Sequence, residues 1–227
     1  MRCLLLGQGP LCDRISDWLG EDVVCRVSRP LTPQDKDFLK GTQADIVVAV
    51  KYRHKLDIEV IESVGGVLNL HNSYLPHGRG AHTNVWALAT DARIAGVTAH
   101  WMDAGYDTGP VVYREQFLGD LREHTARTLW LALDQQAFDV FRFVWTDELW
   151  KKDAIGQESY AEGGSVHYSR DLESLQRINL SDPTTWEDAI DRLRACSFPP
   201  HKGVTWISHG EEFTARIWIE RCPPTTS

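Results

Sequence analysis

The chain has 227 residues, of which 42% are hydrophobic and 25% are charged, a composition typical of a globular protein with one main domain. Its formal net charge of −8 argues against a nucleic-acid partner, because affinity for a phosphate backbone comes largely from clustered Lys and Arg side chains. Apolar runs such as 46–50 are far shorter than the roughly 20 residues that a membrane helix needs, so we expect a cytoplasmic protein with no membrane partner.

The first half of the chain predicts strands that alternate with helices. Apolar runs predict strands at residues 1–7, 23–27, 44–50 and 66–71. Apolar spacing predicts one helix that includes 11–19 and another over 56–64. The cap signal Thr32-Pro33 predicts a further helix that begins at residue 32, and a fourth helix is expected to begin near residue 83. We therefore expect an α/β fold with a mostly parallel, doubly wound sheet.

The pattern changes after Ala95. The stretch AGVTAHWMDAGYDTGPVVYREQF predicts two long strands joined by a loop that contains Asp107, and so an antiparallel addition to the sheet. Apolar residues then recur every three or four positions over 125–150, which predicts one long core helix. The polar, glycine-rich segment 156–164 suggests a loop that leaves the core.

The C-terminal residues predict a small helix/β-hairpin subdomain. Asp182-Pro183 is expected to cap a last helix, and residues 213–219 alternate like an exposed strand. We place a catalytic core at 1–175 and the subdomain at 176–227. The exposed apolar residues of 198–219 make this segment the candidate contact of a dimer.

Neither the cysteines nor the histidines predict a metal site. The five cysteines form no CxxC pair and are odd in number, which argues against a zinc knuckle and against a disulfide framework. We expect free, mostly buried thiols. His71, His77 and His82 lie close together, but no cysteine accompanies them and their spacing fits no zinc pattern, so we expect no metal.

The opening turn GQGP at 7–10 invites a dinucleotide-binding interpretation. It lacks the third glycine of that motif, and Ser28 and Arg29 follow the second strand in place of the acid that would hold a ribose. We therefore interpret it as a simple turn from strand to helix.

The most informative residues are Asn69 and His71, at the end of the fourth predicted strand. Two residues apart on a strand, both side chains project on the same face, with Leu70 on the other. The carboxyl ends of parallel strands are where open α/β sheets place their ligand crevice. If only this pair is considered, a structural explanation is better than a functional one: a polar strand end in which the histidine is hydrogen-bonded to its neighbours.

Asp107 changes that balance. Its loop, flanked by Gly105 and Gly109, can return to the same end of the sheet. A carboxylate beside an imidazole fixes its tautomer and favours its protonated form, and an Asn amide supplies a neutral donor for a developing oxyanion. Asn69, His71 and Asp107 together suit the transfer of an acyl group to an amine without a covalent enzyme intermediate.

Two motifs resemble the formyltransferases that use 10-formyltetrahydrofolate: NLHNSYLP followed by Gly80, and GVTAHWMDAGYDTGP. The resemblance covers roughly the first 150 residues and implies a Rossmann-like formyltransferase core in which Asn69, His71 and Asp107 are catalytic. The segments VKYRHKL, HGRGAHTNVWAL and FPPHKG resemble the sugar N-formyltransferases, which act on nucleotide-linked amino sugars. Thr83 departs from that branch, where a proline is expected.

This resemblance implies 10-formyltetrahydrofolate as the formyl donor, a nucleotide-linked amino-deoxysugar such as dTDP-4-amino-4,6-dideoxyglucose as the acceptor, and a homodimer. It implies that one group of residues contacts the folate: Tyr52, Arg53, His54, Lys55, Met102, Asp103 and Tyr106. It implies that a second group contacts the acceptor: His77, Arg79, His82 and Asn84.

In the implied mechanism, His71 either takes the amine proton through a water or, as an imidazolium, stabilises the oxyanion. Asp107 orients His71 and raises its pKa, and Asn69 donates to the oxyanion. Other interpretations remain open: a different small amine such as glycinamide ribonucleotide as the acceptor, a hydrolase that releases formate, or a binding module that has lost the chemistry.

Overall fold

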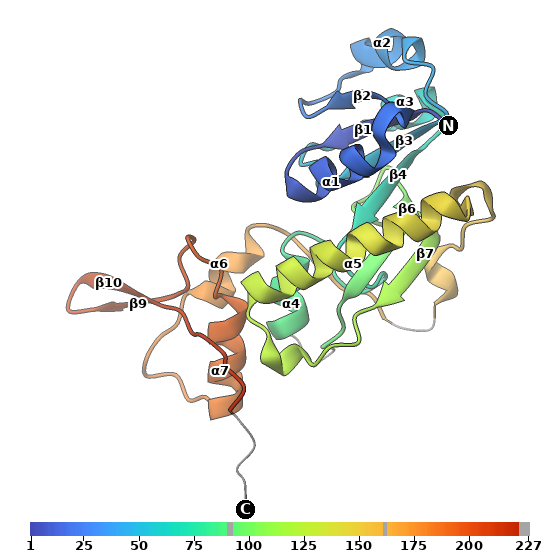
Figure 1. Ribbon diagram of the computed structural model, residues 1–227. Coiled ribbons are helices and arrows are strands. Elements are labelled where there is room, and N and C mark those ends of the chain that lie inside the picture. Colours follow the sequence, from blue (N-terminus) through green and yellow to red (C-terminus); the bar gives the residue numbers. More distant parts are fainter. Residues whose placement is uncertain (90–92, 161–162, 223–227) are drawn as a thin grey trace, which may run out of the picture.

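The computed structural model describes residues 1–89, 93–160 and 163–222. Its central feature is a six-stranded sheet with helices on both faces (Figure 1). The strands of this sheet are β1 Cys3–Gly7, β2 Val23–Val27, β3 Ile46–Val50, β4 Val67–His71, β6 Gly96–Trp101 and β7 Val111–Gln116. Their order is β2-β1-β3-β4-β6-β7. The first four pair in parallel, whereas β4 with β6 and β6 with β7 pair antiparallel.

Alternation along the strands divides the core into two layers. The core helices are α1 Pro10–Leu19, α2 Lys36–Gly41, α3 Ile58–Ser63, α4 Thr83–Ala89 and α5 Ala126–Thr146. In β1, Cys3 and Leu5 belong to the layer with α1, α4 and α5, whereas Leu4 and Leu6 belong to the layer with α2 and α3. All five residues of β3 are buried, as expected for a parallel strand that is covered on both faces.

Two helix ends differ from the prediction. The Thr32 N–H donates to Asp35 Oδ2 at 2.8 Å, but this cap begins a 3-10 turn, Pro33–Asp35, and α2 follows it. The long helix α5 ends at Thr146 rather than at residue 150. Glu148 has a left-handed backbone (φ 50°) that an α-helix cannot contain, and a separate 3-10 turn starts after it.

Within the segment 156–164, the described residues Gln157 and Gly164 lie against the core, so the prediction of a loop that leaves the core is wrong for them. Residues 161–162 of this segment lie outside the described residues. Just after it, β8 (Val166–His167) pairs in parallel with β5 (Arg79–Gly80), beside the end of β4. A Cβ on Gly164 would lie 2.9 Å from the Pro76 carbonyl oxygen. Gly164, one of the glycines that suggested a free loop, therefore permits a close approach to the core.

The C-terminal part consists of two helices and a hairpin that extends away from the core (Figure 1). Its elements are α6 Asp171–Gln176, α7 Trp186–Ala195, β9 Val204–Ser208 and β10 Glu211–Ala215. The N-cap of α7 is Thr185, whose hydroxyl accepts a hydrogen bond from the Asp188 N–H at 3.0 Å, so the predicted cap at Asp182 is wrong. The predicted strand at 213–219 is present only as far as Ala215.

Candidate active site

The structure brings Asn69, His71 and Asp107 together at the carboxyl end of β4. Asn69 Nδ2 donates to Asp107 Oδ1 at 3.2 Å, and His71 Nδ1 lies 3.7 Å from the same oxygen. The other oxygen of this carboxylate accepts a hydrogen bond from the Gly80 N–H at 2.9 Å. The grouping that the sequence suggested is therefore present.

The loop between β6 and β7 is held in one shape by close contacts. Asp107 has a left-handed backbone (φ 53°), which residues other than glycine adopt at a cost. A Cβ on Gly109 would lie 1.9 Å from the Trp101 carbonyl oxygen, so this position requires glycine. Asp103 Oδ1 accepts a hydrogen bond from the Gly105 N–H at 2.9 Å and so closes the turn before Asp107.

His100 is a fourth member of the cluster, and the sequence reasoning missed it. It is 1% exposed and lies directly opposite Asn69 in the antiparallel pairing of β4 and β6. Its Nδ1 donates to the Trp101 carbonyl oxygen at 2.9 Å, and its Nε2 lies 3.5 Å from Asp107 Oδ1. Nε2 lies 3.1 Å from Asn69 Nδ2, so the Asn69 amide donates to His100 and to Asp107 at once.

Burial and neighbouring charges set the protonation states of the cluster. Burial alone would raise the pKa of Asp107, but His71, His100 and the Gly80 N–H outweigh it and hold the pKa well below its usual range. For His71, burial lowers the pKa more than Asp107 raises it. Asp107 thus acts in the predicted direction, but the net pKa of His71 lies below its ordinary value. The free protein therefore has a neutral His71 beside a charged Asp107.

The hydrogen bonds of His71 also identify its basic atom. Nε2 lies 2.9 Å from the Gly78 carbonyl oxygen, which can only accept, so Nε2 carries the hydrogen of the neutral ring. Nδ1 is then the unprotonated nitrogen, and it faces Asp107. A proton that arrives at Nδ1 would form an ion pair with the carboxylate.

Asn69, His71 and Asp107 line a crevice of about 1430 Å³, whereas His100 lies behind them and is not among the lining residues. Because pockets for one small molecule typically measure about 300–1000 Å³, the crevice has room for two ligands. The residues expected to contact folate all line it: Tyr52, Arg53, His54, Lys55, Met102, Asp103 and Tyr106. Of the residues expected to contact the acceptor, His82 and Asn84 are among the lining residues, whereas His77 and Arg79 are not.

Two family models match the chain. Residues 27–138, which include every catalytic residue suggested above, match the model described as formyl transferase. Residues 171–221 match the N-formyltransferase dimerization C-terminal domain. The chain belongs to the formyl transferase family. The family and the fold class that the sequence suggested are thereby confirmed.

Known relatives of this formyltransferase chain match different shares of its length. A methionyl-tRNA formyltransferase from Microcystis aeruginosa is 39% identical over 97 residues, which is 41% of this chain and only 30% of that protein. A 4-N formyltransferase from Francisella tularensis has the same fold: the match covers 97% of this chain and 98% of that one, with a TM-score of 0.83 and 20% identity.

A third similar protein was solved with ligands. This is the formyltransferase PseJ from Anoxybacillus kamchatkensis, in complex with UDP-4,6-dideoxy-4-formamido-L-AltNAc and tetrahydrofolate. The match covers 86% of this chain and 98% of that one, with a TM-score of 0.67 and 26% identity.

In this member of the family, Arg79 is joined from outside the crevice to the loop 102–110, which carries Asp107 and is called the catalytic loop below. Its Nε and Nη2 donate to Gln157 Oε1 at 2.9 and 2.7 Å. Gln157 Nε2 in turn donates to the carbonyl oxygens of Asp107 and Gly109 at 2.8 and 2.9 Å. Arg79 is thus joined to this loop through Gln157, a residue that the sequence reasoning missed, and its expected contact with the acceptor stays a prediction.

The remaining predicted acceptor residues have different surroundings. Asn84 Nδ2 donates to the Ala126 carbonyl oxygen at 2.7 Å, so its amide joins α4 to α5. His82 has a left-handed backbone (φ 57°), and burial together with His201 lowers its pKa. His77 lines a small separate cavity behind the turn that follows β4. Of the four predicted acceptor residues, only His82 lines the crevice with a side chain that makes no hydrogen bond to another described residue.

A second charged group lines the crevice without having been predicted. Lys51 Nζ lies 2.7 Å from Asp134 Oδ1, which also accepts a hydrogen bond from Asn72 Nδ2 at 2.7 Å. The Lys51 ammonium lies 5.3 Å from the centre of the Trp130 ring. Burial lowers the pKa of Lys51, although Asp134 opposes this effect. The one feature of the sequence that could have indicated this pair is Asp134, a charged residue that follows Leu133 on the apolar face of the predicted core helix.

Three further expectations concern the whole chain. None of the helices in the described ranges combines the length and hydrophobicity needed to cross a membrane. Within those ranges, no three His, Cys, Asp or Glu side chains form a group that could hold a metal ion. The compartment and the absence of a metal stay predictions. The cysteines are free, and Cys3, Cys12 and Cys196 are buried, as expected.

Proposed function

We propose that this protein transfers the formyl group of 10-formyltetrahydrofolate to the amine of a nucleotide-linked amino-deoxysugar. The observation that carries the proposal is the grouping of Asn69, His71 and Asp107 in a crevice with room for two ligands. The ligands of PseJ, a formamido sugar nucleotide and tetrahydrofolate, support this choice. A tRNA acceptor fits less well, because the net charge of −8 opposes binding to a phosphate backbone.

One part of the crevice fits the folate donor. Tyr52–Lys55 follow β3 and Met102–Tyr106 follow β6, and both segments line the crevice. The Lys55 ammonium lies 5.3 Å from the centre of the Tyr106 ring and so connects the two segments. We assign these segments to the pterin. When bound, the donor supplies an electrophilic formyl carbon.

Neutral His71 is the base for the acceptor amine. As the amine nitrogen bonds to the formyl carbon, His71 Nδ1 receives the amine proton, directly or through a water, and Asp107 at 3.7 Å stabilises the imidazolium that results. His71 then returns this proton to the leaving nitrogen of the folate as its bond to the formyl carbon breaks, so tetrahydrofolate leaves as the free amine. The Gly78 carbonyl oxygen keeps the hydrogen of the neutral His71 ring on Nε2, so the unprotonated Nδ1 is available as the base before any ligand binds. The lowered pKa of His71 favours this role over that of a resting imidazolium.

Asn69 supplies the hydrogen-bond donor for the negative charge that develops on the formyl oxygen. Its amide donates to both His100 and Asp107 before the reaction. When His71 is protonated, its positive charge attracts the Asp107 carboxylate. This weakens the hydrogen bond from Asn69 to Asp107, and one N–H of the Asn69 amide becomes free to donate to the formyl oxygen. His100 keeps the amide oriented, because its own Nδ1–H is fixed by a backbone carbonyl.

Mass spectrometry of a panel of dTDP-, GDP- and UDP-linked amino-deoxysugars tests the proposed function. With the protein and 10-formyltetrahydrofolate, at least one sugar should gain a formyl group on its amine. Release of formate without any acceptor would identify a hydrolase instead. Formylation of glycinamide ribonucleotide alone would keep the chemistry but replace the acceptor, and no reaction with any compound would refute the transferase.

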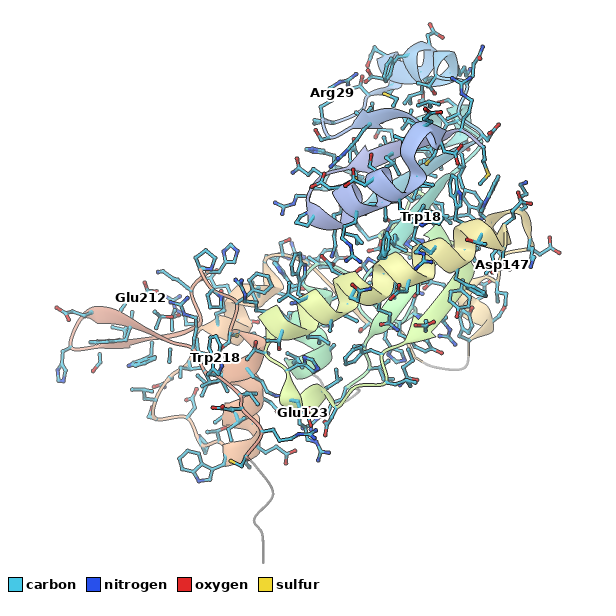
Figure 2. The ribbon with its side chains drawn as sticks, viewed as in Figure 1. Trp18, Arg29, Glu123, Asp147, Glu212 and Trp218 are labelled. Carbon is cyan, nitrogen blue, oxygen red and sulfur yellow. The ribbon has the colours of Figure 1, made fainter. Side chains whose placement is uncertain are left out.

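We also propose that the protein is a homodimer in which residues 171–221 form the contact. Trp186 and Trp218 in this part are 87% and 89% exposed, and such apolar exposure marks protein contacts. Figure 2 shows Trp218 in the C-terminal part, far from Arg29 on the opposite side of the molecule. The match to a dimerization domain supports this contact. The boundary suggested by the sequence, after residue 175, falls within α6 and stays a prediction.

Light scattering during size-exclusion chromatography tests the dimer. The wild-type protein should have about twice the chain mass of 25.7 kDa, because the exposed tryptophans are then buried in the contact. Trp186→Glu should shift the mass to that of one chain, whereas Trp18→Glu on α1 should leave the dimer intact. A wild-type mass of one chain would contradict the proposal.

A further inference from the structure

The charged pair Lys51–Asp134 joins two elements that are far apart in the sequence, the end of β3 and the middle of α5. Both residues line the crevice, next to Trp130. The Lys51 charge contributes to the lowered pKa of His71, but no bond or proton in the steps assigned to Asn69 and His71 involves the pair, so its hydrogen-bonding groups in the crevice need another explanation.

Stability alone explains the pair poorly. Lys51 has a left-handed backbone (φ 54°), a conformation that side-chain-bearing residues adopt at a cost and that is concentrated at functional sites. Asp134 is buried, and replacing a buried ion pair by well-packed apolar residues is often neutral or stabilising. A strained cation paired with a buried anion in a ligand crevice therefore indicates a binding role.

The pair offers a donor and an acceptor side by side. Asp134 Oδ1 accepts from both Lys51 and Asn72, whereas Oδ2 accepts no hydrogen bond from residues 1–89, 93–160 or 163–222. Oδ2 is not among the enclosed polar atoms that lack a partner, so it remains accessible. Lys51 has three N–H donors, and Asp134 takes one of them.

The chemistry of the pair selects among possible ligand groups. A phosphate near Lys51 would be repelled by the Asp134 carboxylate, and a protonated amine near Asp134 would be repelled by Lys51. Two neighbouring hydroxyls suit both groups, since each hydroxyl can donate to a carboxylate oxygen or accept from an ammonium. The aromatic face of Trp130 beside the pair adds an apolar surface against which the C–H side of a sugar ring can pack.

We infer that Lys51, Asp134 and Trp130 form a subsite for a vicinal diol of the acceptor. This inference rests on the proposed sugar N-formyltransferase function and makes these residues determinants of acceptor specificity. The diol comes from the hexose or from the ribose of the nucleotide. A dTDP-linked sugar, whose deoxyribose has no vicinal diol, separates the two sources.

Steady-state kinetics with the acceptor found in the panel test this subsite. For Lys51→Met and for Asp134→Asn, the acceptor KM should rise about 10- to 100-fold, as expected for the loss of a hydrogen bond to a charged group. The change in kcat should be much smaller, and the Kd of 5-formyltetrahydrofolate should stay that of the wild type, because the folate segments are unchanged. Lys36→Met is the matched control, because Lys36 also has a carboxylate partner at 2.7 Å, Glu59, but lies outside the crevice.

The double variant Lys51→Met/Asp134→Leu separates binding from folding. It removes both charges together, so its melting temperature should return toward that of the wild type while the acceptor KM stays high. A double variant that regains the wild-type KM would show that the pair is only structural and would overturn the inference. So would single variants with an unchanged KM.

The outcomes also separate this inference from the proposed function. If the wild type formylates a dTDP-linked sugar and Lys51→Met raises the KM for it, the hexose supplies the diol. If the KM rises only for a UDP-linked sugar, the ribose supplies it. A wild type that formylates an acceptor while neither variant changes any KM refutes the subsite alone, and a wild type that formylates nothing refutes both proposals.

Discussion

Replacing His71 by Gln should lower kcat for formyl transfer by about 1000-fold, within the range of about 10²–10⁴ for a lost general base. The variant keeps a polar side chain on β4 but lacks a nitrogen that can take the amine proton. Folate affinity should stay within a few-fold of the wild type, because the segments assigned to the pterin are unchanged. His124→Gln, outside the crevice at the start of α5, is the matched control.

The pH dependence of the wild type distinguishes the two roles that His71 can have. Burial lowers its pKa, so the neutral base should be present throughout the neutral range. The kcat/KM profile should therefore lose activity only as the pH falls through a pKa below about 6.5, the ordinary value for histidine. Activity that declines as the pH rises through such a pKa would show that the imidazolium is the active form and would contradict the mechanism.

Replacing Asp107 by Asn should lower kcat by about 100- to 1000-fold, because the charge that stabilises protonated His71 is lost while the shape of the loop is retained. The Gly80 N–H keeps an oxygen acceptor in this variant, so the loop should remain folded. Asp120→Asn is a suitable control. Asp120 also has a lowered pKa, about 2, but it lies on the surface beside Arg122.

The same variant should change the acid stability of the protein. Since the pKa of Asp107 is held low in the folded protein, its charged form contributes stability that is fully present above the unfolded pKa of about 3.9 and is lost progressively as the pH falls from there through the lower pKa of the folded protein. The difference in melting temperature between wild type and Asp107→Asn should therefore be constant near pH 7 and shrink as the pH falls below about 3.9. A difference that does not change between pH 7 and pH 3 would show that folding does not lower the pKa of Asp107.

The sequence predicted that Asn69, His71 and Asp107 lie together, because the signals for this grouping are local. Asn69 and His71 lie two residues apart on a strand, and the glycines around Asp107 mark a turn that returns to the sheet. His100 was invisible for a different reason. Its place opposite Asn69 depends on the register of β4 and β6, which short-range patterns do not specify.

The supporting contacts could not be predicted, because they join residues that are distant in the chain. Lys51 meets Asp134, and Arg79 meets Gln157, only after the crossovers are in place. The lowered pKa of His71 likewise could not be predicted from the sequence. A neighbouring carboxylate can be guessed from the sequence, but the burial that outweighs it is a property of the packed site.

Gln157 lies outside both family matches, in the connector between the catalytic core and the C-terminal part. A fragment that ended with α5 would contain Asn69, His71 and Asp107, yet nothing would replace the Gln157 hydrogen bonds that hold the catalytic loop. During synthesis, the site is complete only once this connector has left the ribosome. An exchange of C-terminal domains between relatives must therefore keep the connector with the core, since a junction placed directly after α5 would remove a support of the catalytic loop.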